Sequence, residues 1–137
     1  MVTFEFPPFH WLGGEGAYAA GLCDTLLKLG HEVTVLTTNI NMRVSHNAER
    51  PHVVFIDTIN RPPFRFLSFF GRARGELKKI RQKGNFDIVH YINSYSIPVI
   101  SRQEVNMPVV ATMHQPYVDE RKACLLNALG KLTVGYS

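Results

Sequence analysis

Short runs of apolar, β-prone residues recur along the chain and predict strands. They lie near residues 2–6, 33–37, 53–57, 86–92 and 109–113, and residues 132–136 resemble the opening of a sixth strand. The run at 33–37, VTVLT, lacks the alternation with polar residues expected of a half-exposed strand. Such runs are typical of strands covered on both faces, and hence of a parallel sheet.

Between these runs, apolar residues recur at the three- and four-residue spacing of a helix face. The clearest case spans residues 15–29 and comprises Tyr18, Ala19, Leu22, Cys23, Leu26 and Leu29. Gly30 follows at the position where a left-handed residue commonly ends a helix. A second helix is expected from about residue 66 to 83, broken or weakened near Gly71 and Gly75, and shorter helices or turns at 96–104 and 120–129. Alternating strands and helices predict a doubly wound, Rossmann-like α/β fold, with a mainly parallel sheet and helices on both faces.

Length and composition fit one soluble domain spanning residues 1–137. Hydrophobic residues make up 45% of the chain, and no apolar run approaches the roughly 18 residues that a membrane helix needs. The first residues lack the layout of a signal peptide, so a cytoplasmic location is expected. Cys23 and Cys124 belong to no motif and are expected to be buried thiols.

The net charge of +4 is concentrated in one segment. Between Arg61 and Lys83 lie eight basic residues and one acid, so this segment carries +7 and the remainder −3. Phenylalanines are interleaved with these cations, a pattern typical of a surface that binds anionic lipid. The candidates for binding the surface of the membrane, on its inner face, are Arg72, Arg74, Lys78, Lys79, Arg81 and Lys83. Alternatively, the phenylalanines face the sheet and the cations form a solvated helix face. No recognition motif accompanies the charge, so nucleic acid is not expected as a partner.

Three loops are candidates for ligand binding, because open α/β sheets bind ligands at the carboxyl ends of their strands. They are residues 7–15, 93–96 and 114–117. In the first, Gly13 and Gly14 open a helix, where free N–H groups could meet a phosphate or a sugar oxygen. Alternatively, these glycines only turn the chain. The glycines do not match the dinucleotide fingerprint, because a stretch with two prolines lies between the strand and Gly13.

His114 directly follows the fifth strand, where an imidazole can donate a hydrogen bond to a hydroxyl or phosphate. Alternatively, its ring is satisfied by backbone groups. His90 lies inside the fourth strand and is expected to be buried and hydrogen-bonded, whereas Asn93 and Ser94 at the end of this strand are better placed to touch a ligand. The remaining histidines lack metal-ligand spacing, so no metal site is expected.

Several blocks resemble the N-terminal domain of retaining GT-B glycosyltransferases (glycosyl transferase group 1, family 4-like). They are FPPFHWLGGEGAYAAGLCDTLLKLGHEVTVLTT at residues 6–38, then FDIVHYINS, PVVATMHQP and LTVGYS, in the family's order. The resemblance implies transfer of a sugar from a nucleotide-sugar donor to a sugar or lipid-linked acceptor, with retention of configuration and without a metal or other cofactor. It places Gly13 and Gly14 on the donor, His114 at the transferred sugar as the catalytic residue, and Glu15, Tyr18 and Asn93 along the acceptor side.

The resemblance also has departures and alternatives. Many relatives carry a second histidine where this chain has Ile92, so any acceptor role of that residue is lost. The family's C-terminal nucleotide-sugar domain would be the partner of this one, and the 137-residue chain alone is not expected to turn over nucleotide sugars. The alternatives are a non-catalytic sugar- or partner-binding module of the same fold, or another GT-B enzyme such as a sugar-nucleotide epimerase. The F-P-P and Gly-Gly opening favours the transferase over the epimerase.

Overall fold

The computed structural model describes residues 1–10, 13–38, 51–59, 61, 64–84, 86–92 and 107–114. Its elements are β1 (Val2–Thr3), α1 (Gly14–Lys28), β2 (Thr34–Thr37), β3 (His52–Phe55), α2 (Phe64–Lys83), β4 (Val89–Ile92) and β5 (Val109–Thr112). The elements predicted at 96–104, 120–129 and 132–136 lie outside the described residues, as do Asn93, Ser94 and Cys124.

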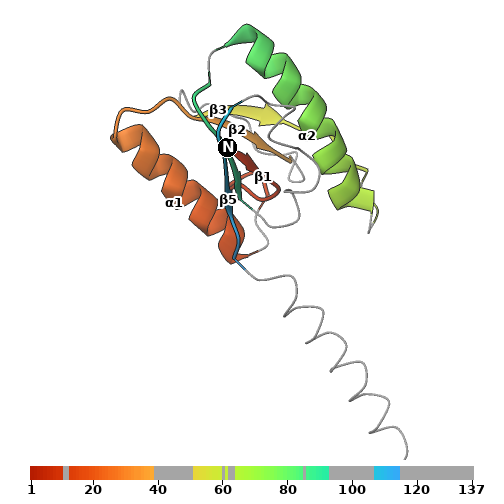
Figure 1. Ribbon diagram of the computed structural model, residues 1–137. Coiled ribbons are helices and arrows are strands. Elements are labelled where there is room, and N and C mark those ends of the chain that lie inside the picture. The colour runs from red at the N-terminus through yellow and green to blue at the C-terminus, as the bar shows by residue number, and fades with distance from the viewer. Residues whose placement is uncertain are drawn as a thin grey trace, which may run out of the picture.

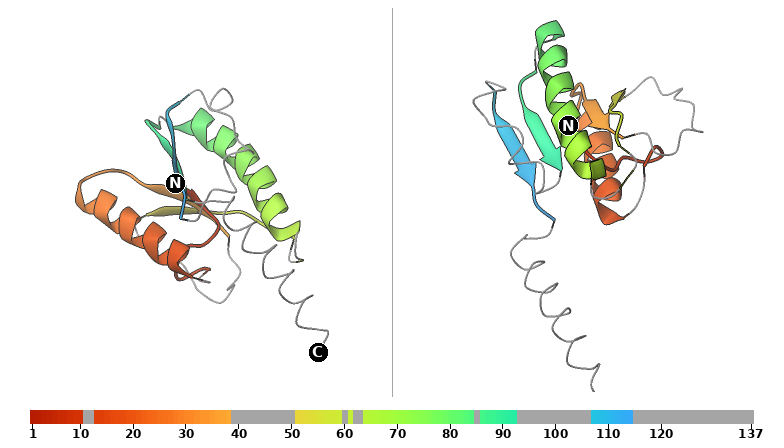
Figure 2. Two further views of the ribbon diagram at one scale, coloured as in Figure 1. Left: turned by 60° about the horizontal axis from the view of Figure 1, so that its bottom comes forward. Right: turned by 90° about the vertical axis from the view of Figure 1, so that its right-hand side faces the viewer.

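The five strands form one parallel sheet in the order β3-β2-β1-β4-β5. The central strand β1 pairs on both sides, so that Val2 stands opposite Leu36 of β2 and Tyr91 of β4. α1 covers one face of the sheet and α2 the other (Figure 1; Figure 2, left panel). The predicted Rossmann-like α/β fold is therefore confirmed, and its strand order reverses beside β1.

Each helix contributes to a separate hydrophobic cluster. On the α2 side, the buried residues are Val2, Phe4, Leu36, Ile56, Phe69, Phe70, Ala73, Leu77, Val89 and Tyr91. On the α1 side, they are Phe6, Phe9, Ala19, Cys23, Val35 and Ile92. Neighbouring residues of one strand, such as Val35 and Leu36, thus pack on opposite faces, which explains the unbroken apolar run at residues 33–37. Cys23 is buried, as predicted.

The first strand is shorter than the predicted range of 2–6, because the chain turns back on itself after Thr3. The carbonyl oxygen of Phe4 accepts a hydrogen bond from Thr38 Oγ1 at 3.0 Å and lies 3.0 Å from Nδ1 of His10. The Phe6 carbonyl accepts hydrogen bonds from the N–H groups of Phe9 and His10, both at 3.0 Å. Phe6 and Phe9, which belong to the cluster on the α1 side, therefore lie in a turn where a longer strand was expected.

The helices also correct one prediction. α2 runs unbroken through Gly71 and Gly75, both of which are exposed. Burial of the opposite face outweighs the roughly 1 kcal/mol that each glycine costs a helix. α1 ends as predicted, because Gly30 has a φ of 85° and donates its N–H to the carbonyl of Leu27 at 3.0 Å.

We expect the inward face of α2 to carry much of the fold's stability. Phe69 is fully buried, whereas Phe64 on the same helix is 56% exposed. Phe69→Ala should lower the free energy of unfolding by about 3–5 kcal/mol, because it leaves a cavity in the core. Phe64→Ala should cost less than about 1 kcal/mol. Urea unfolding of both variants tests this, and equal losses would contradict the packing of α2.

Candidate functional site

The candidate site lies at the carboxyl edge of the sheet, beside the switch between β1 and β4. α1 begins at this edge directly after the loop that follows β1. The first predicted loop, 7–15, is described except for residues 11 and 12, and of the loop 114–117 only His114 is described. The predicted loop 93–96 lies outside the described residues. The site therefore comprises groups from β1, α1, β4 and β5.

Glu5 fixes the beginning of α1 against the end of β1. Its carboxylate oxygen Oε2 accepts a hydrogen bond from the N–H of Gly13 at 3.0 Å. Gly16, in the first turn of α1, is buried against Glu5 and Pro7. A Cβ at this position would stand 3.3 Å from Cβ of Glu5 and 3.4 Å from Cδ of Pro7. The helix can approach β1 this closely only because residue 16 has no side chain. A carboxylate at a helix N-terminus is also electrostatically favourable.

Gly13 and Gly14 occupy a more open position than Gly16. A Cβ at either residue would meet no heavy atom within 4 Å. Gly13 has extended backbone, with a φ of −173°, which any residue can adopt. Neither packing nor backbone conformation in the described part of the chain therefore requires glycine at these two positions. Both are exposed, and they leave accessible the N-terminal end of α1, where backbone N–H groups and the partial positive charge of the helix favour an anion.

A second group of polar side chains connects α1 to strands β4 and β5. The ring of Tyr18, one helical turn after Gly14, stacks edge-on against His114 with ring centroids 4.6 Å apart. The Tyr18 hydroxyl lies 3.5 Å from Oγ1 of Thr112, and this oxygen lies 2.7 Å from Nε2 of His90. His114 is thus connected through Tyr18 and Thr112 to a histidine inside the sheet.

His90 is half-buried and hydrogen-bonded, close to what its position in the strand predicted. Burial lowers the pKa of His90 below its ordinary value of 6.5, and the nearby ammonium group of Met1 lowers the pKa further. The imidazole is therefore neutral at pH 7. A neutral ring has one N–H and one lone pair, so its Nε2 either donates a hydrogen bond to the Thr112 hydroxyl or accepts one from it, according to the tautomer.

The structure brings some of the predicted site residues together and separates others. Gly13, Gly14, Glu15 and Tyr18 lie in the first turns of α1, and Tyr18 contacts His114. The membrane-surface candidates lie on α2, across the sheet. Of these, Arg72, Lys78, Lys79 and Arg81 are exposed and Arg74 is half-buried, while the side chain of Lys83 lies outside the described residues.

Sequence reasoning missed Glu5, Thr112 and His10. Glu5 was hidden in a run read as strand, and its contact with Gly13, eight residues later, depends on the turn between them. Thr112 could not be identified because its contact with His90 depends on strand register. His10 is 3% exposed and its Nδ1 lies 3.0 Å from both the Phe4 carbonyl oxygen and Oγ1 of Thr38, so it supports the turn after β1.

Neither a metal site nor a membrane-spanning helix is found in the part of the chain that the structure describes. No three His, Cys, Asp or Glu residues there are grouped as metal ligands. Within the same residues, neither helix is both long and apolar enough to cross a bilayer.

Comparison with known proteins adds a family. The model of Glycosyltransferase Family 4 matches residues 12–134. An uncharacterized glycosyltransferase of Methanocaldococcus jannaschii is 27% identical over 135 residues, which cover 90% of this chain and 34% of the relative. The chain thus spans about a third of the length of this curated relative. No solved structure gives a significant match.

The neutral state of His90 predicts a pH dependence of folding stability. Since the pKa of His90 is lowered in the folded state, the unfolded chain binds more protons between the folded value and 6.5. The stabilisation that neutral His90 adds to the free energy of unfolding is therefore complete above about pH 6.5 and is lost as the pH falls below this value. His90→Gln keeps a partner for Thr112 but cannot titrate. Urea unfolding at about pH 5 and pH 8 should show a smaller loss for this variant than for the wild type, and equal losses would contradict the prediction.

Proposed function

This chain belongs to glycosyltransferase family 4, and we propose on this basis that it is the acceptor-side half of an enzyme that transfers a sugar from a nucleotide-sugar donor, with retention of configuration. The observation that carries the proposal is the arrangement at the carboxyl edge of the sheet. There the open N-terminus of α1 lies one helical turn from Tyr18, whose ring packs against His114. An anion site beside hydrogen-bonding side chains suits a sugar diphosphate.

The donor diphosphate is proposed to bind at Gly13 and Gly14. The absence of side chains lets its oxygens approach the first turn of α1, where N–H groups point outward. Because the Glu5 carboxylate already bonds the Gly13 N–H, the diphosphate would meet the N–H groups that follow it. Negative charge that develops on the leaving diphosphate would be stabilised by these preorganised dipoles. In this proposal, these residues bind the diphosphate without a metal or other cofactor.

His114 is proposed to donate a hydrogen bond to a hydroxyl of the transferred sugar. Its ring is exposed and packs against Tyr18, so it is accessible to a ligand yet limited in its orientation. Catalysis of this kind depends on positioning, and small displacements of a reacting group are costly. Glu15, Tyr18 and Asn93 would lie along the acceptor. Of these, Glu15 is half-buried in the first turn of α1.

The nucleotide is proposed to bind to a second domain, the partner of this one in the complete enzyme. Transfer would then occur between the two domains and not in the 137-residue chain alone. A non-catalytic module of the same fold would bind a sugar without consuming the donor. Measuring the loss of nucleotide sugar with the full-length protein distinguishes the two functions, and binding without turnover would contradict the enzyme.

Gly14→Ala tests the proposed donor site. The methyl group would project into the open space at the start of α1, so kcat/KM for the full-length protein should fall at least tenfold, or about 1.4 kcal/mol. Gly21→Ala is a matched control, because residue 21 is exposed in the middle of α1 and its Cβ would also meet no atom within 4 Å. This control should keep full activity and gain up to about 1 kcal/mol in stability. Equal activity of both variants would remove Gly14 from the site.

His114→Ala tests the proposed catalytic residue. We expect turnover by the full-length protein to fall about 100-fold or more, because a hydrogen bond to the reacting sugar is lost. The unfolding free energy should change by less than about 1 kcal/mol, since the side chain is exposed. His114→Gln retains a donor and should recover part of the turnover. Unchanged turnover in His114→Ala would refute this role.

A further inference from the structure

α2 buries one face and leaves apolar side chains on the other. Phe69, Phe70, Ala73 and Leu77 fill the core beneath it. At its first turn, however, Phe64 is 56% exposed, Leu67 is 67% exposed and Phe66 is 43% exposed. The alternative that the phenylalanines face the sheet therefore holds for Phe69 and Phe70 and in part for Phe66, but not for Phe64. Large apolar side chains held in water at one end of a helix are suited to insertion into an apolar phase.

The remaining turns of α2 are strongly cationic. The helix has seven basic residues and one acid, Glu76, which bonds Lys79 at 2.6 Å. Arg72, Lys78 and Arg81 are exposed. By contrast, α1 has two acids and one basic residue. The cationic charge therefore belongs to this helix and does not reflect the whole molecule.

The apolar and cationic groups lie along one line of the helix. Positions 64, 67, 71, 74, 78 and 81 follow at three- and four-residue spacing, so they share a face. We call this line the outer face of α2. It begins with Phe64 and Leu67, passes Gly71, and continues with Arg74, Lys78 and Arg81. Such a face matches the boundary of an anionic bilayer, where apolar side chains meet acyl chains and cations meet lipid phosphates.

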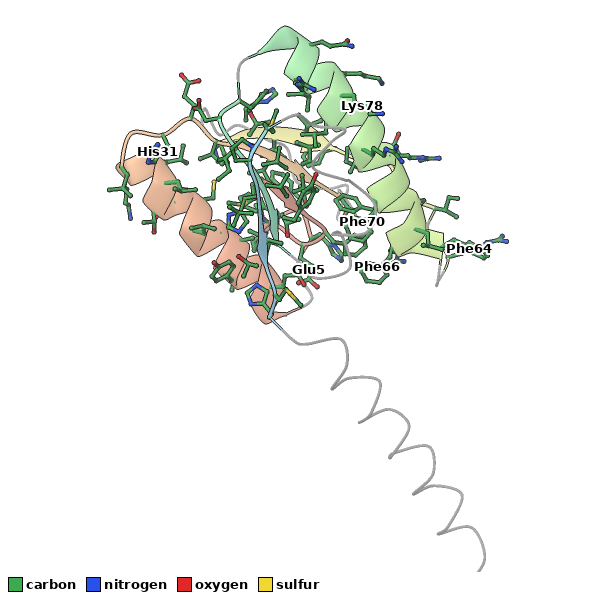
Figure 3. All side chains as sticks on the ribbon, in the orientation of Figure 1. Glu5, His31, Phe64, Phe66, Phe70 and Lys78 are labelled. Carbon is green, nitrogen blue, oxygen red and sulfur yellow. The ribbon has the colours of Figure 1, made fainter. Side chains whose placement is uncertain are left out.

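The apolar end of α2 lies at the same edge of the sheet as the candidate site. The ring of Phe66 packs against Phe4, which directly follows β1, with centroids 4.4 Å apart. Glu5, the next residue, holds the N-terminus of α1. In Figure 3, Phe64 and Phe66 lie toward the same end of the molecule as Glu5. A membrane that receives Phe64 therefore lies close to the candidate site.

We propose that the outer face of α2 docks on an anionic membrane surface, with Phe64 and Leu67 inserted at the headgroup boundary. Lys78 and Arg81 of this face contact lipid phosphates. Leu67, the most exposed large apolar side chain of α2, has no aromatic ring to stack on a base, which favours lipid over nucleic acid. Resting on the proposed function, this docking makes a lipid-linked acceptor the substrate class of the site.

Sedimentation of the 137-residue chain with vesicles tests the docking. The probes are vesicles of phosphatidylcholine alone and vesicles that also contain about one third phosphatidylglycerol. We expect binding only to the anionic vesicles, with affinity falling at least tenfold between low and high salt. The double variants Phe64→Ser/Leu67→Ser and Lys78→Gln/Arg81→Gln should each lower the partition coefficient at least tenfold. All four side chains are exposed, and circular dichroism checks that the fold is retained.

Leu29→Ser is the matched control, because Leu29 follows α1 and is 69% exposed, as Leu67 is on α2. It should bind as the wild type does. The proposal is overturned if the wild type stays in the supernatant with anionic vesicles at low salt, or if Leu29→Ser weakens binding as much as Phe64→Ser/Leu67→Ser does. It is also overturned if single-stranded DNA binds more tightly than the vesicles and Phe64→Ser/Leu67→Ser leaves vesicle binding unchanged.

The two proposals fail separately in this design. Vesicle binding by the isolated chain does not require sugar transfer, and full-length His114→Ala should bind anionic vesicles as the wild type does. Vesicle binding without turnover of any nucleotide sugar would leave the docking in place and contradict the transferase. Turnover with a water-soluble acceptor and no vesicle binding would support the transferase and contradict the docking.

Discussion

The right-handed crossover between parallel strands decides where the other parts of this chain lie. From β1 the chain passes through α1 to β2 on one side, and from β3 it returns through α2 to β4 on the other side of β1. Because both crossovers have the same hand but opposite directions, their helices must cover opposite faces of the sheet. The two separate hydrophobic clusters follow from this. So does the switch beside β1, the place where open α/β sheets bind ligands.

At that switch, two kinds of glycine serve α1 in different ways. Gly16 allows contact, since a Cβ would press on Glu5 and Pro7, whereas Gly13 and Gly14 border open space. The Glu5 carboxylate bonds the Gly13 N–H and offsets part of the positive end of the helix, an interaction of about 0.3–1 kcal/mol near a surface. A diphosphate bound there would have to outcompete or lie beyond this carboxylate. The fixed position of α1 thus limits where such a ligand can approach.

The sequence was sufficient to predict the class of fold and, within the described residues, both helices and most strand positions, because these depend on local apolar spacing. It could not show where β1 ends, since side chains of His10 and Thr38, from later in the chain, gather at the Phe4 carbonyl. The predicted break in α2 failed because the glycines lie on the exposed side and packing holds the helix. At the site, the Tyr18–His114 contact joins residues 96 positions apart, and Thr112 reaches His90 only through the register of β4 and β5.

Charge and topology together make the two faces of the molecule electrostatically different. The acidic balance of α1 and the basic balance of α2 lie on opposite faces of the sheet, so an anionic surface attracts one face and repels the other. Because every crossover helix of a parallel sheet starts at the carboxyl edge, the apolar first turn of α2 and the glycines of α1 begin at the same edge. A surface that binds α2 along its length therefore lies beside the candidate site. Under the proposed docking, an acceptor anchored in that surface would reach the edge by moving within the plane of the membrane, without leaving it.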